Sequence, residues 1–196
     1  MKHSCVLGFL LVALAGSQAF AEVRGELKLV PVDPCAKELA NASAGRRGGQ
    51  QTPGMKDLRK PCGFQLVKKF SGKGPIEPVG GHPPDDILPV KEILADLSVK
   101  NPGQLQFVYV PAKPSAQITD VRIAIYAKEK LVWMSQTSPQ LVKALNSGQD
   151  LLVFAPDASA TKAMAPFFKP ENALALEMKT ADTQSERGSI ILSKTK

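Results

Sequence analysis

The sequence is poor in the side chains that carry most enzymatic chemistry. Its 196 residues include two histidines, three cysteines and one tryptophan, and aromatic residues make up 6%. No Gly-x-Ser-x-Gly motif occurs, and no glycine-rich phosphate loop follows a predicted strand. These absences argue against Ser-His-Asp and Cys-His catalysis. We therefore predict no cofactor and assign no catalytic, cofactor-binding or metal-ligating residue.

His82 is the one histidine that invites a metal or acid-base interpretation, because Asp85 and Asp86 follow it closely. One histidine cannot make most familiar zinc sites, and no second cluster of ligands is visible in the sequence. The surrounding stretch is rich in glycine and proline, which is typical of an exposed linker. We therefore interpret this stretch as a linker. Two carboxylates could still meet from distant positions, so hydrolysis by a carboxylate pair stays open.

Long hydrophobic runs are also scarce, apart from one near the N-terminus. An apolar run from Cys5 to Ala15 follows Lys2 and precedes Ala19-Phe20-Ala21. This is the pattern of a secretory signal peptide, with cleavage after Ala21. No later run reaches the roughly 18 apolar residues that a membrane-spanning helix needs. We predict a signal peptide at 1–21 and a soluble protein in the periplasm of a bacterium, or in the secretory pathway or outside the cell of a eukaryote.

Removal of the signal peptide would leave two cysteines, Cys35 and Cys62, in an oxidising compartment. We expect them to form a disulfide. The bridge would close a loop of about 26 residues and contribute about 3 kcal/mol in the chain-entropy model. A redox-active pair would need close spacing such as Cys-x-x-Cys, which is absent. A structural disulfide is therefore the favoured interpretation.

Positive charge is concentrated in one window, residues 45–73, which holds eight basic side chains against Asp57 and so has a net charge of +7. The candidate anion-binding residues are Arg46, Arg47, Lys56, Arg59, Lys60, Lys68 and Lys69, with Lys73 beside them. Such a segment would meet an anionic glycan or lipid surface and release its counterions. A solvated loop whose charge only maintains solubility is the competing interpretation. Nucleic acid is disfavoured as a partner, because few aromatic side chains interleave with the charges.

Apolar periodicity divides the chain unevenly. Residues 22–87 have two strand-like runs, 26–32 and 64–70, among polar, glycine-rich and proline-rich stretches, and we predict an N-terminal arm there. Residues 88–196 show regular patterns, and we predict a β-rich globular domain. Its expected helices are 90–97, one that begins at Pro139 with Ser138 as N-cap and stops at Gly148, and 160–168. Its expected strands are 105–110, 121–126, 131–134, 151–154, 174–178 and 189–192.

These elements predict an α+β fold or a decorated all-β fold, with a mainly antiparallel, sandwich-like domain. Strict alternation of strands with long crossover helices is missing, which disfavours a doubly wound parallel sheet. Trp133 lies among apolar residues of a predicted hairpin, and we expect it in the core rather than at a ligand. Asn41-Ala42-Ser43 would accept a glycan only in a eukaryotic source.

The sequence therefore favours a secreted, non-enzymatic binding or assembly module that contacts a polyanion or a protein partner through its basic arm. Two alternatives stay open. One is a small secreted hydrolase that uses a carboxylate pair, and the other is a structural component of an envelope or matrix.

Overall fold

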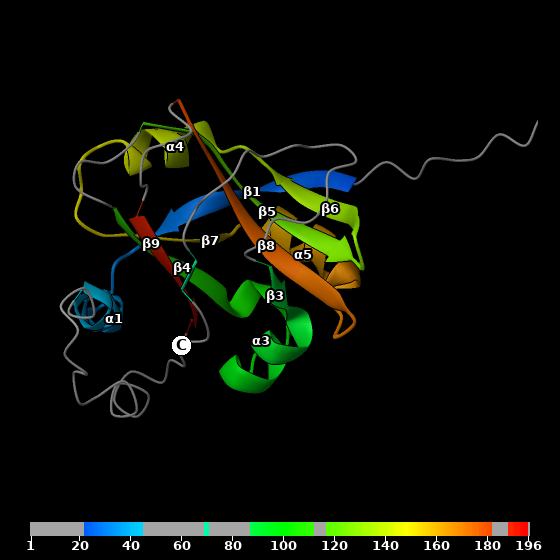
Figure 1. Cartoon of the computed structure of the whole chain (residues 1–196). Coiled ribbons are helices and arrows are strands. Elements are labelled where there is room, and N and C mark those ends of the chain that lie inside the picture. Colours follow the sequence, from blue (N-terminus) through cyan, green and yellow to red (C-terminus); the bar gives the residue numbers. More distant parts are fainter. Residues whose placement is uncertain (1–21, 45–68, 71–86, 112–116, 182–187, 196) are drawn as a thin grey trace, which may run out of the picture.

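The computed structural model describes residues 22–44, 69–70, 87–111, 117–181 and 188–195 (Figure 1). The strands are β1 (Glu22–Val30), β2 (Lys69–Phe70), β3 (Leu88–Pro89), β4 (Leu105–Pro111), β5 (Ile118–Ala127), β6 (Lys130–Gln136), β7 (Leu152–Pro156), β8 (Asn172–Thr180) and β9 (Gly188–Lys194). The helices are α1 (Pro34–Ala44), α3 (Val90–Leu97), α4 (Pro139–Leu145) and α5 (Ala158–Met164), with short 3-10 turns at Pro102–Gln104 and Ala165–Phe167. The nine strands form one mixed sheet in the order β2-β9-β4-β7-β1-β6-β5-β8-β3.

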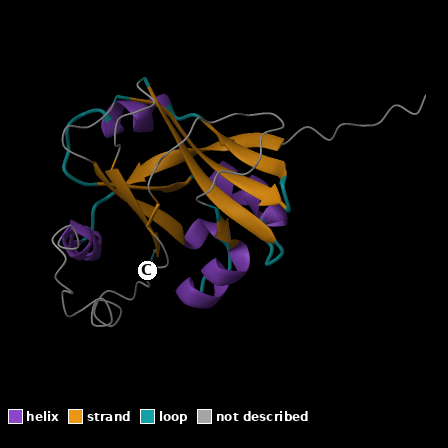
Figure 2. Cartoon of the chain, viewed as in Figure 1, coloured by secondary structure: helices purple, strands orange, loops and turns teal. Residues whose placement is uncertain are grey.

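β1 is the central strand and joins the two halves of this sheet. Its first residues pair in parallel with β6, where Glu22 lies opposite Trp133, and its last residues pair antiparallel with β7, from Leu27 to Val30. The register shifts between Val23 and Glu26, around Gly25, whose φ is +75°. All other strand pairs described are antiparallel. The prediction of a mainly antiparallel α+β fold is confirmed, but the strands make one curled sheet rather than the expected sandwich (Figure 2).

The main core lies on the inner face of the curled sheet, where side chains from both halves meet α3, α4 and α5. Phe107 of β4 and Phe154 of β7 stack there with ring centroids 5.3 Å apart. Trp133 of β6 is fully buried in the same cluster, as expected. The alternating apolar residues of β4, β5, β8 and β9 thus fill one interior.

Local signals predicted where α3 and α4 begin, whereas α5 begins at Ala158, before the expected residue 160, and gives way to a 3-10 turn at Ala165–Phe167. α3 spans the expected residues 90–97 and buries Val90, Ile93 and Leu97. α4 begins after Ser138, whose hydroxyl accepts a hydrogen bond from Leu141 N, with Pro139 in the first turn. α5 begins after Asp157, whose carboxylate accepts from Ala160 N. Each cap satisfies a backbone N–H that the first turn of a helix leaves without a partner.

The expected N-terminal arm is corrected for residues 22–44, because β1 and α1 belong to the fold. α1 lies in the stretch that we interpreted as a polar disulfide loop. The Asp33 carboxylate accepts a hydrogen bond from Ala36 N at 2.7 Å and so caps the helix. Ala36 and Leu39 then pack on the outer face of the sheet, with apolar residues of β4, β7 and β9. Of the expected strand 64–70, the structure describes only β2; residues 45–68 and 71–86 lie outside the described residues.

Candidate functional site

The outer face of β5, β6 and β8 carries a cluster of polar side chains, which we call the outer polar cluster. Its members are Asp120, Arg122, Tyr126, Thr137 and Glu177. The first three lie on β5 at spacings of two and four residues, so they share one face of the strand. Glu177 of β8 lies directly opposite Arg122, and Thr137 directly follows β6.

Arg122 connects β5 to the end of β6. Its Nε lies 2.9 Å from Asp120 Oδ2 and donates a hydrogen bond to Thr137 Oγ1 at 3.0 Å. Thr137 Oγ1 in turn donates to Asp120 Oδ1. One Nη group of Arg122 also contacts the Met134 sulfur at 3.9 Å. These contacts form a triangle of Asp120, Arg122 and Thr137, which attaches Thr137 to β5. Thr137 is the residue before Ser138, the N-cap of α4.

Glu177 and Tyr126 form the deeper half of the outer polar cluster. The Tyr126 hydroxyl donates a hydrogen bond to Glu177 Oε1 at 2.7 Å, and Glu177 is only 7% exposed. Burial raises the pKa of the Glu177 carboxyl, although the Tyr126 hydrogen bond and the nearby Arg122 charge act in the opposite direction. Burial, together with the hydrogen bond to Glu177, also raises the pKa of Tyr126.

The outer polar cluster brings together two carboxyl groups, Asp120 and Glu177, as the carboxylate-pair hypothesis required. Each is already engaged inside the sheet, Asp120 by Arg122 and Thr137, and Glu177 by Tyr126. Glu177 is also too deeply buried to offer its carboxyl broadly to a substrate. The contacts therefore describe a polar network that ties strands together, and no catalytic step follows from them.

None of the residues of the outer polar cluster was predicted from the sequence as a site. Arg122 and Glu177 are 55 positions apart, and they lie opposite each other only because β5 pairs with β8. The only local signal was the polar pair Asp120 and Arg122 within an apolar strand.

Residues 45–68, which we call the basic segment, are flanked by two elements that contact the same half of the sheet. α1 ends at Ala44, where the segment begins, and contacts β4 and β9. β2 pairs antiparallel with β9, Lys69 opposite Ile191. Figure 1 shows α1 beside β9 and β4. Of the seven candidate anion-binding residues, only Lys69 lies within the described residues; Arg46, Arg47, Lys56, Arg59, Lys60 and Lys68 lie outside them.

Cys35 lies on the first turn of α1 and is buried against the sheet with Val108, Val153 and Ile191. Cys62 lies outside the described residues, so its pairing with Cys35 stays a prediction.

We expect mass spectrometry of a non-reduced digest of exported protein to detect a peptide pair joined through Cys35 and Cys62. The same digest after reduction and alkylation is the control, in which the linked pair should disappear. Free thiols on both cysteines in the non-reduced sample would contradict the prediction.

The remaining sequence candidates are few. His82, Asp85 and Asp86 lie outside the described residues. Within the residues that the structure describes, no group of three or more His, Cys, Asp or Glu side chains could hold a metal ion. The helices of that same part of the chain include none long and apolar enough to cross a membrane. Asn41 lies exposed on α1, away from the helix face that packs on the sheet.

Comparison of the chain with protein-family models, with curated proteins and with solved structures found no match.

Proposed function

We propose that this chain is a non-enzymatic binding module that acts outside the cytoplasm and contacts anionic surfaces through its basic segment. The observation that supports this proposal is the attachment of the segment at both ends. α1 packs on the outer face of β4 and β9 immediately before residue 45, and β2 pairs with β9 immediately after residue 68. Both attachments are to β9 or its neighbour β4, so the two ends of the segment start from the same half of the sheet.

Charge supports the same proposal. Residues 45–68 carry six basic side chains against Asp57, a net charge of +5 between two anchored ends. Cations that are confined near one another attract a polyanion more strongly than the same cations spread over a surface. Glycan sulfates and lipid phosphates both offer closely spaced anions, and each contact releases counterions.

Replacing Arg46, Arg47, Arg59 and Lys60 together with glutamine should weaken binding to heparin or to anionic lipid vesicles at least about tenfold, since each basic residue near an anionic surface contributes about 1 kcal/mol. Binding of the unaltered protein should fall steeply as salt is added. Binding to vesicles and binding to heparin are measured separately, because the proposal requires only that the protein bind one of the two. If these side chains face an anionic partner, as we propose, thermal stability should stay nearly unchanged, because exposed charges contribute little to folding.

A matched control removes the same charge elsewhere. Lys128, Lys130, Lys162 and Lys169 are all exposed and lie outside the basic segment. Replacing these four with glutamine lowers the net charge by the same amount but leaves the basic segment unaltered. Binding should then stay within about twofold of that of the unaltered protein. If both quadruple variants bind as the unaltered protein does at low salt, the segment is a solvated loop. An equal loss in both variants would show a general effect of charge without a site.

A further inference from the structure

Glu177 is an acidic side chain buried in the outer face of a sheet with one neutral hydrogen-bond donor. Its Oε1 accepts from the Tyr126 hydroxyl, and the residue is only 7% exposed. Around it lie apolar side chains of the same face, Ala124 and Ala175 among them, which are fully buried. A carboxylate in such surroundings loses much of its hydration, and a single hydroxyl donor replaces little of it. The fold therefore favours the protonated form more strongly than water does.

In the described part of the sheet, Arg122 is the cation directly opposite Glu177, and it also contacts Asp120. Arg122 lies directly opposite Glu177 across the β5 and β8 ladder, at the separation at which cross-strand side chains meet. Its Nε, however, already serves Asp120 and Thr137. A guanidinium carries five N–H donors, so Arg122 retains donors that could serve a second carboxylate. Two acidic groups thus flank one arginine.

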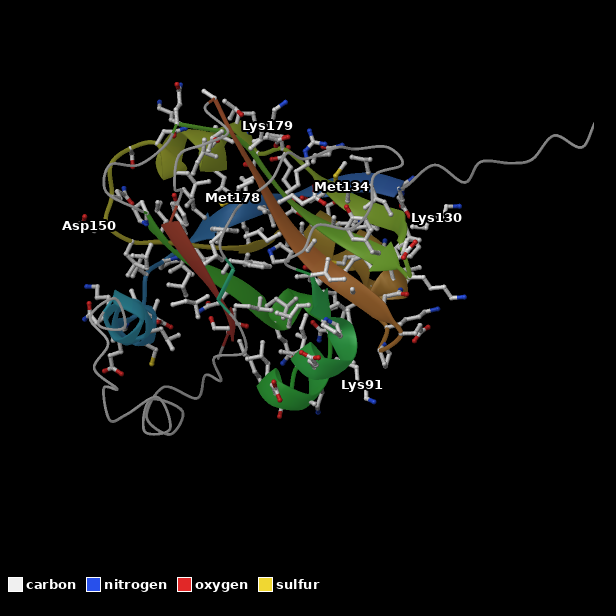
Figure 3. All side chains as sticks on the ribbon, viewed as in Figure 1. Lys91, Lys130, Met134, Asp150, Met178 and Lys179 are labelled. Atoms are coloured by element: carbon white, nitrogen blue, oxygen red, sulfur yellow. The ribbon has the colours of Figure 1, made fainter. Side chains whose placement is uncertain are left out.

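The other side chains near Glu177 do not reverse the shift of its carboxyl toward the protonated form. β5 contributes the titratable groups already named, Asp120, Arg122 and Tyr126. On β8 itself the next residue of the same face is Lys179, which is exposed and lies opposite Asp120 in the ladder. β6 presents Met134 and Leu131 to this face, and both are uncharged. Met134 and Lys179 are labelled in Figure 3, on the two strands that flank β5.

We propose that Glu177 is a proton-controlled switch that redistributes Arg122 between Asp120 and Glu177. When Glu177 holds its proton, it accepts from Tyr126, and Arg122 serves Asp120 and Thr137, as in the structure. When the proton leaves to solvent, Glu177 becomes a second anion, and its charge draws the Nη donors of Arg122 toward β8. Because the guanidinium is one rigid plane, this movement turns its Nε away from Asp120 and Thr137. The triangle of Asp120, Arg122 and Thr137 then loosens, and with it the attachment of the residue that precedes α4. The outer face of β5 and β8 is consequently tightest in acid.

The sign of the effect on stability follows from proton binding. The pKa of Glu177 in the folded protein lies above its ordinary value of 4.5. At pH values between the ordinary and the raised pKa, the folded state therefore binds more protons than the unfolded chain. Stability contributed by this group is therefore fully present below the ordinary pKa and is lost as pH rises toward the raised one. For one group, the folding equilibrium constant falls by at most about tenfold per pH unit.

The test compares the unaltered protein with Glu177→Gln and Glu129→Gln, using urea unfolding at a series of pH values from 4 upward. Glutamine keeps an oxygen for Tyr126 but cannot ionise. Glu129→Gln is the matched control, because Glu129 is an exposed acid in the turn between β5 and β6. The decrease in stability with rising pH should be smaller in Glu177→Gln than in the unaltered protein. Glu129→Gln should keep the full decrease. The same pH dependence in all three proteins would overturn the proposal.

A second measurement tests the competition for Arg122 and does not depend on the Glu177 variant folding. The carboxyl carbon of Glu177 is titrated by NMR in the unaltered protein and in Asp120→Asn. Glu177 should titrate at higher pH than the exposed glutamates, and Asp120→Asn should move its midpoint to lower pH, because Arg122 then serves Glu177 alone and the repulsion from Asp120 is gone. An unshifted midpoint in Asp120→Asn would show that Glu177 is only a buried acid and would overturn the redistribution.

Discussion

Replacing Gly25 with alanine should destabilise the protein by more than about 4 kcal/mol, the range that marks a severe steric conflict. A Cβ at this position would lie 2.1 Å from the backbone nitrogen of Ala160, 2.2 Å from its Cα and 2.6 Å from its Cβ. The first turn of α5 cannot simply move away. Asp157 caps that turn, and its own backbone N–H donates to Glu26 O of β1 at 2.9 Å. Unfolding by urea or heat measures the effect.

Gly148→Ala is the matched control for this prediction. Gly148 has nearly the same positive φ, +77°, but a Cβ there would meet nothing within 4 Å. Alanine at residue 148 should therefore cost only the strain of a left-handed backbone, about 1–2 kcal/mol. Equal losses in the two variants would mean that backbone strain alone explains Gly25, and that α5 does not pack closely on β1.

Deleting residues 22–30 should abolish cooperative unfolding. These residues form β1, which pairs with β6 on one edge and β7 on the other and so connects the two halves of the sheet. Without β1 each half would expose an unpaired strand edge and part of the inner core. Circular dichroism during heating measures the transition. A sharp transition in the shortened chain would show that the rest of the fold does not depend on β1.

Single substitutions at two leucines of β1 also test whether this strand is central to the fold. Leu27 is fully buried in the inner core, whereas Leu29, two residues later on the same strand, is 44% exposed. Leu27→Ala should cost about 2–5 kcal/mol, since it leaves a cavity in the packed core. Leu29→Ala should cost about 0.5 kcal/mol or less. Similar losses of stability from the two substitutions would contradict the central position of β1. In a peripheral strand, neither leucine would be buried more deeply than the other.

The sequence by itself determined the local elements of this protein. Helix α3 has its predicted bounds, because Val90, Ile93 and Leu97 recur at the spacing of one helical face. Ser138 and Pro139 mark the start of α4, because capping depends on neighbouring residues alone. The alternation in β5 and β6 predicted the hairpin that joins them. The sequence also contains the start signal of α1, Asp33 followed by Pro34, although the polar composition of the following stretch led us to expect a loop.

Only the tertiary structure decided which distant segments meet. The polar pattern of Glu22–Val30 does not indicate a central strand, and its place between β6 and β7 depends on residues more than 100 positions away. The outer polar cluster arises in the same way, because Arg122 reaches Glu177 only through the register of β5 and β8. Strand pairing is set by the sum of many weak contacts across the whole core, whereas helix caps and periodicity act within a few residues. For this reason composition and spacing predicted the elements, and the assembled sheet alone revealed the buried acid beside a shared arginine.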